Sequence, residues 1–281
     1  MLDAESSLTV YLRCCCVARS NPTRHQPSTK YYKGLALFFS ALALLTLSTV
    51  ATAAGEVVVA STSLTGAIAR AAGATEVRVL TPANASHPPE YDLKPSDLLK
   101  LEGARVVVYA GYERMVSRLV ETARDRGIIA VQVDTTLSPE TLIAQVRNVA
   151  AALKTEKEAG SWGKGFLQAL SALKAKLAPV AGKRAVVHWH ARAFSSWAGL
   201  NVVQVVPLGE LTPKVIADSV AQKPDVVVDI LHSPVAKTIA ENAKCKYVQI
   251  INFPGVENTA SLTDIFEYNT NQMLKAFVSS K

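Results

Sequence analysis

The sequence predicts an α/β fold of two similar lobes, each a mostly parallel sheet flanked by helices. Three observations lead to this prediction. Short apolar, β-branched runs alternate with helical patterns, which is typical of parallel strands covered on both faces. The alternating series occurs twice, and a long stretch of purely helical spacing separates its two copies. With 281 residues and 49% hydrophobic content, the chain can bury real cores, so disorder is excluded as its main state.

Residues 1–54 are interpreted as a leader that precedes the fold. Lys30–Lys33 provides a positively charged region, Gly34–Val50 an apolar run, and Ala51–Ala54 the small residues of a cleavage site. An uncleaved membrane anchor is the alternative, because the apolar run is close to the shortest spanning length. We therefore expect secretion through an N-terminal signal sequence and a periplasmic or extracytoplasmic location.

Cysteine usage and charge exclude two further features. Cys14, Cys15 and Cys16 precede the apolar run, so they form no lipid-attachment site, and Cys245 is left alone in the mature chain without a disulfide framework. The formal charge is +7, of which three charges fall in the leader. The other basic residues form no run interleaved with aromatic residues, so we predict no nucleic-acid binding.

Residues 55–138 form the predicted N-terminal lobe. Its expected strands are short runs rich in Val and Ile: Glu56–Ala60, Glu76–Leu80, Arg105–Tyr109 and Ile128–Val133. Its expected helices have apolar residues at helical spacing: Leu64–Ala72, Ser96–Leu101 and Met115–Arg126. Three prolines stiffen the loop within Ala85–Asp97 that carries His87. Such a loop suits metal capture because little ordering entropy is lost on binding, although a rigid connector with a solvated His is the alternative.

Residues 139–181 form the predicted connecting segment between the lobes. Pro139–Lys154 and Glu156–Leu177 have helical spacing and follow each other with a mild interruption around Gly160–Gly165. The second stretch is rich in Ala, Leu and Lys, which are good helix formers. We expect it to be a long connecting helix, with an ordinary core helix as the alternative.

Residues 182–281 form the predicted C-terminal lobe. The expected strands are again β-branched runs: Arg184–Val187, Val202–Val206, Asp225–Asp229 and Tyr247–Ile251. The expected helices are Pro213–Gln222, Pro234–Ala243 and the amphipathic Leu262–Val278. Thr212 and Ser233 are the expected caps of the first two helices, because a proline follows each of them. A cleft is expected between the lobes.

All four histidines of the predicted mature chain follow predicted strands. They are His87, His188, His190 and His232, whereas His25 falls in the leader. Ligands of open α/β sheets bind outside the carboxyl ends of the strands, and imidazole is the commonest ligand of zinc and its neighbours. Each His alone is as well explained as a surface or core residue. The shared position of all four favours a metal site, although His188 and His190 would point to opposite sides of an extended strand.

Other chemistry has weaker support. Glu90, Asp92 and Asp229 are carboxylates that could join the imidazoles at a site of about four ligands. The chain contains no G-x-S-x-G, P-loop, H-E-x-x-H or C-x-x-C pattern, so the common hydrolase and nucleotide chemistries are not indicated. Aromatic residues beside His188, at positions 189, 194 and 197, are interpreted mainly as core packing and less as a wall of the cleft.

At these residues the chain resembles the zinc/manganese-type solute-binding proteins of bacterial ABC importers. The resemblance covers essentially residues 56–280 and depends on Val58–Leu64, Tyr91–Asp97 and His188–Leu200, with Ser233-Pro234 and Tyr268-Asn269 further on. It implies two α/β lobes joined by a long rigid helix, with one metal ion between the lobes. It also implies a monomer that is not an enzyme and whose partner is an ABC permease in the inner membrane.

The ligand set implied by this resemblance is altered here. Pro89 holds the position of the family's first His, so His87 or Glu90 would have to substitute for it. The family's second ligand has no counterpart in the segment from Asp134 to Pro139. The third matches His188, and the fourth, an Asp, corresponds to Asn252.

We therefore expect metal ligation by His87, His188 and His232, completed by Glu90 or Asp229, with His190 as an additional candidate. More imidazole and less carboxylate favours zinc, copper or nickel over manganese, and zinc is the first choice. The leading hypothesis is an extracytoplasmic receptor that captures this divalent transition metal and delivers it to an ABC importer. The alternatives are the same fold binding a metal complex or small organic solute, and third, a zinc-dependent hydrolase with Glu90 as base.

Overall fold

A computed structural model describes residues 57–82, 85 and 87–278. The predicted leader, with its three cysteines, lies outside the described residues. All of the described residues belong to one unit, Ala53–Lys281. Among them, no helix is both long enough and apolar enough to span a membrane.

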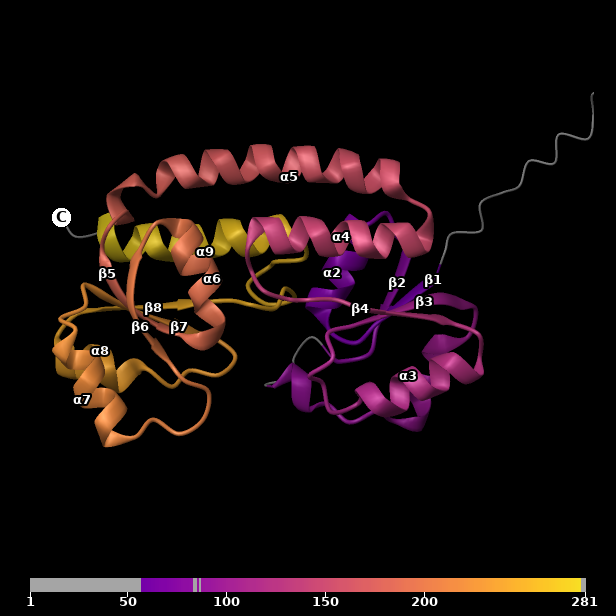
Figure 1. The fold of residues 1–281 in the computed structure, drawn as a ribbon, viewed down its shortest axis with the longest axis horizontal. Helices are drawn as coiled ribbons and strands as arrows, with labels where there is room; N and C mark the ends of the chain where they lie inside the picture. Colours follow the sequence, from indigo (N-terminus) through magenta and orange to yellow (C-terminus); the bar gives the residue numbers. More distant parts are fainter. Residues whose placement is uncertain (1–56, 83–84, 86, 279–281) are drawn as a thin grey trace, which may run out of the picture. The chain divides into compact units, whose positions relative to one another are not determined.

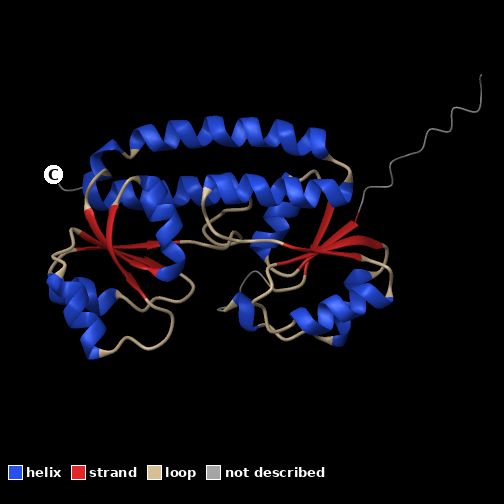
Figure 2. Cartoon of the chain, in the orientation of Figure 1, coloured by secondary structure: helices blue, strands red, loops and turns tan. Residues whose placement is uncertain are grey.

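The N-terminal lobe is built on a four-stranded parallel sheet with strand order β2-β1-β3-β4 (Figures 1 and 2). The strands are β1 (Val57–Ala60), β2 (Glu76–Val79), β3 (Ala104–Tyr109) and β4 (Ile129–Gln132). Helix α2 (Ser63–Ala71) covers one face of this sheet, and α3 (Val116–Asp125) packs on β3 and β4. The central strands are buried on both faces, which explains their continuous runs of Val rather than an alternating pattern.

The C-terminal lobe repeats this plan with strand order β6-β5-β7-β8, again all parallel. The strands are β5 (Arg184–His188), β6 (Asn201–Val206), β7 (Val226–Ile230) and β8 (Lys246–Ile250). The helices of this lobe are α6 (Arg192–Ala198), α7 (Pro213–Ala221), α8 (Lys237–Ala243) and α9 (Leu262–Val278). The predicted fold class of two parallel α/β lobes is confirmed.

A helical layer is shared by the two sheets. It contains α4 (Pro139–Leu153), α5 (Glu156–Lys176) and the 3-10 turn η3 (Ala178–Val180), and α5 packs along both α4 and α9 (Figure 1). Residues from both sheets and from this layer form one continuous hydrophobic core, in which the ring of Phe166 on α5 meets Phe266 on α9 at 5.6 Å. Motion between the lobes would have to disturb this shared core, which restricts their independent movement.

Several local predictions were wrong. Helix α5 runs without interruption through Gly160–Gly165, and the break falls earlier, at Lys154, which adopts the left-handed conformation (φ 60°). The segment Ser96–Leu101 is helical as predicted but belongs to a 3-10 helix, η2 (Pro95–Leu101). Helix α6 was not predicted, and its C-terminal cap is Gly199, whose φ of 92° suits glycine.

The two predicted helix caps had different outcomes. Thr212 caps α7 by accepting a hydrogen bond from the Val215 N–H at 3.3 Å, as predicted. Ser233 does not cap α8, because that helix begins only at Lys237. The free N–H groups of Val235 and Ala236 instead donate to the carboxylate of Asp229.

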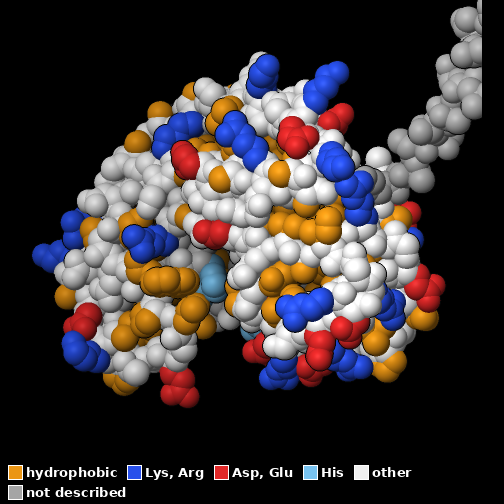
Figure 3. Space-filling view, turned by 45° about the vertical axis from the view of Figure 1, so that its right-hand side comes forward, with side chains coloured by type: hydrophobic (Ala, Val, Ile, Leu, Met, Phe, Trp, Pro, Cys, Tyr) orange, Lys and Arg blue, Asp and Glu red, His pale blue; other side chains and the backbone are white. Residues whose placement is uncertain are grey.

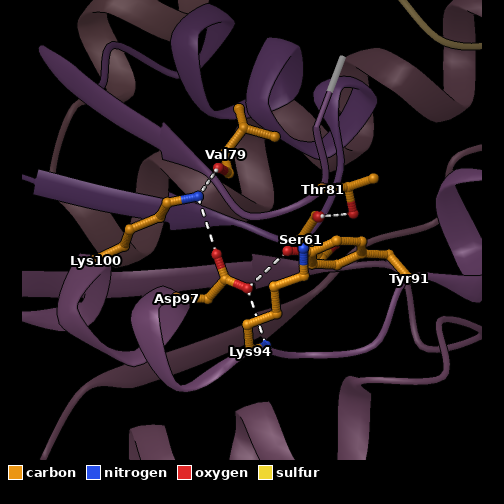
Figure 4. A network of polar contacts seen from close by, with 7 residues as sticks. All are labelled: Ser61, Val79, Thr81, Tyr91, Lys94, Asp97 and Lys100. Carbon is orange, nitrogen blue, oxygen red and sulfur yellow. Dashed lines mark hydrogen bonds and ion pairs between the residues drawn. The ribbon is translucent and has the colours of Figure 1, made fainter. Parts of the chain in front are cut away.

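Asp97 anchors the loop that carries His87. Its carboxylate accepts hydrogen bonds from the Tyr91 hydroxyl at 2.8 Å and from the Lys94 N–H at 3.0 Å, and it forms an ion pair with Lys100 at 3.1 Å (Figure 4). Lys100 also donates to the carbonyl of Val79, which ties this network to the end of β2. The part of the loop next to Asp97 is therefore fixed by this carboxylate as well as by its prolines.

Replacing Asp97 with Ala is expected to lower the free energy of unfolding by about 2–3 kcal/mol, because Asp97 is 4% exposed and its partners lose a charged acceptor. Burial by itself would raise the pKa of Asp97, but the bonds from Lys94, Tyr91 and Lys100 outweigh it and lower the pKa below its ordinary value. The contribution is therefore complete above about pH 4 and disappears as the pH falls through the lowered pKa. Denaturant unfolding at pH 7 and at acidic pH measures both effects.

Asp92→Asn is the matched control for the Asp97 variant. Asp92 lies on the same loop, is exposed, and forms only a 3.4 Å ion pair with exposed Arg114. Its removal should change stability by less than about 1 kcal/mol. Equal effects at both positions would contradict the anchoring role of Asp97.

Candidate metal centre

The site follows from the topology of the two sheets. In each lobe the strand order reverses between its first and third strands, β1 and β3 in one lobe and β5 and β7 in the other. Loops that leave such strands diverge to opposite faces of the sheet and leave a crevice at the carboxyl edge, where ligands of α/β folds bind. His188 is the last residue of β5, and His232 follows β7 by two residues.

A pocket of about 280 Å³ contains all four predicted histidines: His87, His188, His190 and His232. Its other walls come from the loop after β6 (Pro207–Gly209), from the segment after β7, and from Asn252 and Phe253 after β8. Figure 3 shows histidine side chains exposed at the bottom of a hollow, with hydrophobic side chains around it. Histidines from three separate parts of the chain thus line one pocket.

The chain turns sharply at the end of β5, which places His188 and His190 together. A 3-10 turn, η4 (Trp189–Ala191), begins directly after His188, so the two residues do not alternate as they would along a strand. Their rings stack at 5.5 Å between centroids, and the His190 N–H donates to Nδ1 of His188 at 3.1 Å. The chain therefore bends here, which is the condition under which we expected that both residues could reach the same site.

His188 is buried and has specific electrostatic surroundings. Burial lowers its pKa from the ordinary value, nearby Asp229 opposes this effect, and His190 adds to it. The ring is therefore neutral near pH 7, which is the form that binds metal ions. Because Nδ1 accepts a hydrogen bond, the ring proton lies on Nε2.

His232 carries the most informative polar atom of the pocket. Its Nδ1 is buried without a hydrogen-bond partner, and so is Oδ1 of Asn252. Burial lowers the pKa of His232, the Asn252 side chain raises it, and His87 lowers it again, so both residues lie near this ring. Phe253 packs edge-on against the ring at 5.5 Å between centroids. The His232 and Asn252 side chains lie close enough to interact with each other, and both can also serve as ligands of a cation in this pocket.

The two predicted carboxylate ligands are placed differently. Asp229 is fully buried, and its carboxylate accepts four hydrogen bonds, from the Ile230, Val235 and Ala236 N–H groups and from the Tyr247 hydroxyl. These bonds fix the chain on both sides of His232, at Ile230 before it and at Val235 and Ala236 after it. Glu90 is exposed at the end of the 3-10 turn η1 (Pro88–Glu90). Of the described residues that line the pocket, none is Asp or Glu.

Within the described part of the chain, no three His, Cys, Asp or Glu side chains are arranged as a group that could hold a metal ion. The ligand atoms that the pocket lining offers are imidazole nitrogens and the amide oxygen of Asn252. Asn252 was noticed in the sequence only through the family resemblance, and the Pro207–Gly209 loop was missed. A polar residue directly after the last strand is the sequence feature that could have identified Asn252 independently.

Together, these features define a two-lobed α/β binding protein with a histidine pocket at the carboxyl ends of its strands. The family model described as "Zinc-uptake complex component A periplasmic" matches residues 58–276. The chain belongs to this family of periplasmic metal-binding solute-binding proteins, as the resemblance in the sequence implied. Comparison with curated proteins gives no matching relative.

Solved structures share the fold at low sequence identity. The solute-binding protein FpvC of Pseudomonas aeruginosa, in complex with Ni²⁺, is 18% identical, with a TM-score of 0.61 over 80% of this chain and 97% of FpvC. The Mn-bound periplasmic metal-binding protein of Candidatus Liberibacter asiaticus is 13% identical, with a TM-score of 0.64 over 79% of this chain and 99% of its own. The Cd-bound form of the latter protein has a TM-score of 0.63 at 14% identity, over 79% of this chain and 99% of its own.

Proposed function

We propose that this protein captures a divalent transition metal ion, with zinc as the first choice, in its histidine pocket and delivers it to an ABC permease in the inner membrane. The observation that supports this most is the convergence of four imidazoles on one pocket in a protein of this family. Neutral imidazole is the preferred protein ligand of zinc, copper and nickel. The metal is the cargo, so it must be held tightly and still be released.

The proposed ligands are His87, His188 and His232, with His190 or Asn252 completing the set. These side chains line one pocket but, within the described part of the chain, do not form a ready-made group of three ligands, so metal capture would require them to move closer together. Asp229 is left out, because its carboxylate already accepts four hydrogen bonds and removing it from them would cost the fold. Glu90 is left out because it is exposed outside the pocket. This donor set has fewer carboxylates than the resemblance implies.

The donor set also determines the preferred metal. Manganese and magnesium prefer carboxylate and carbonyl oxygens, whereas a site of imidazoles suits zinc, copper and nickel. The Ni²⁺, Mn²⁺ and Cd²⁺ complexes of the structural neighbours show that this fold accommodates several divalent metals. We therefore expect zinc or nickel to bind in preference to manganese here.

Binding through His188 requires a local change at the end of β5. In the present hydrogen bond Nδ1 accepts from the His190 N–H, so Nε2 carries the proton and has no free lone pair. If the metal binds Nε2, the proton must move to Nδ1 and the His190 N–H must turn away. We propose that this rearrangement of η4 accompanies metal capture.

The test is the metal content of tag-free mature protein purified from the periplasm without chelator. About one zinc or other divalent metal ion per chain is expected by elemental analysis, and His188→Ala should reduce it to a small fraction. Ser195→Ala is the matched control, since this buried hydroxyl lies on the neighbouring helix α6. Wild-type protein that neither retains metal nor binds any of zinc, copper, nickel or manganese in calorimetry would contradict the proposal.

A further inference from the structure

A second cavity, of about 670 Å³, adjoins the histidine pocket. His190 and Asn252 line both spaces, so the larger cavity reaches the proposed metal position. A bare metal ion needs no such volume, whereas small organic ligands occupy cavities of roughly 300–1,000 Å³. The size and position of this cavity thus call for an occupant larger than an ion.

Aromatic side chains form part of its wall. Trp189 comes between His188 and His190 in the sequence. Its side chain lines the cavity and is 50% exposed, which is unusual for so large a ring. Trp197 lines the cavity while packing edge-on against Phe266, at 4.9 Å between centroids. The packed ring of Trp197 and the exposed ring of Trp189 offer flat surfaces to an organic ligand.

Charges of both signs also line the cavity. Arg192, exposed at the start of α6, stands on the C-terminal lobe. Asp134 and Glu140 line the N-terminal lobe, together with the hydroxyl groups of Thr135 and Ser138. An aminocarboxylate fits this arrangement, because its carboxylates can accept from the guanidinium and its amine N–H groups can donate to the acidic side chains.

The donors of the histidine pocket point to the same class of ligand. None of the described residues that line the histidine pocket is Asp or Glu, and the carboxylate that acts on His188, Asp229, is already held by four hydrogen bonds. A divalent cation in this partly buried pocket therefore gains little counter-charge from the lining itself. A bound chelator would supply the missing carboxylates from its own structure.

We propose that the protein binds its metal as a chelate with a small aminocarboxylate, with the metal against the histidines and the organic part in the second cavity. This inference rests on the proposed function, since it requires metal binding at the same histidines. It adds a substrate class: the cargo is a metal complex rather than a bare ion.

The experiment compares two probes by calorimetry on tag-free protein: Ni²⁺ alone and Ni²⁺–iminodiacetate, a chelate that leaves coordination positions open for imidazole. Ser196→Trp fills the second cavity, and Arg192→Glu reverses its charge without filling it. Each change should weaken binding of the chelate at least tenfold and alter binding of Ni²⁺ alone by less than twofold. His188→Ala should weaken binding of both probes.

The outcomes separate the two proposals. Equal losses for both probes in the cavity variants, or no loss for the chelate, would overturn the chelate inference while metal capture stands. Wild-type protein that binds neither probe would remove the proposed function as well. Thermal unfolding of both variants must match the wild type, and Arg192→Glu remains informative if the bulkier Ser196→Trp fails to fold.

Discussion

His232→Leu is expected to weaken metal binding by at least about 100-fold while leaving the fold as stable as before. Loss of supporting groups around a metal site already costs 10–100-fold in affinity, and His232 is proposed as a direct ligand. Its Nδ1 is buried and forms no well-aligned hydrogen bond, so an apolar residue of similar size removes a polar group that contributes little to stability. The free energy of unfolding should change by less than about 1 kcal/mol or increase.

This combination distinguishes a ligand from a structural histidine. Competition with a chromophoric chelator measures the affinity, and denaturant unfolding without metal measures the stability. Ser233→Ala is the matched control, because Ser233 lines the same pocket and should leave affinity unchanged. A His232→Leu protein that keeps its metal affinity, or loses it only together with its stability, would contradict the role given to His232.

The fold could be predicted from the sequence because its strands are buried on both faces. Runs such as Val57–Ala60 and residues 226–228 are continuously apolar, and the helices between them carry clear start and stop residues. The short helix α6 was missed, because its seven residues span less than two full helical turns and their aromatic residues resembled a core cluster. The alternation of strands and helices then predicted parallel sheets. Their carboxyl edges are where the histidines lie.

The position of the histidines could be predicted, but the roles of the carboxylates could not. Strand ends show where a side chain emerges, so the common location of the four imidazoles followed from local patterns alone. Asp229 also lies near the end of a strand, β7, but its carboxylate accepts hydrogen bonds from N–H groups six and seven residues further along the chain. No local pattern reveals that these N–H groups take up the carboxylate of Asp229. They are left without helical partners only because α8 begins late, at Lys237.

Burial of two of the proposed histidine ligands has a consequence for metal binding. The pKa of His188 and that of His232 both lie below the ordinary value, chiefly because of burial. Protons therefore compete weakly with the metal for these rings near pH 7, and binding gains little from counter-charge. A site with this composition selects its metal through the type of ligand atom that it offers and through any organic ligand already bound to the metal.

Asn252→Asp is expected to shift the metal preference of the pocket toward manganese, raising Mn²⁺ affinity at least tenfold. The change keeps the shape of the side chain and puts a carboxylate where Oδ1 is buried without a partner. Carboxylate oxygen is the donor that manganese prefers, and its charge offsets that of the cation.

The same charge should raise the pKa of His232, so metal affinity should fall more steeply below neutral pH than in the wild type. Competition titrations with Mn²⁺ and Zn²⁺ from about pH 5.5 to 8 measure both effects. Asn201→Asp, at the exposed start of β6, is the control for adding one negative charge away from the pocket. An unchanged ratio of Mn²⁺ to Zn²⁺ affinity would mean that Asn252 does not face the metal.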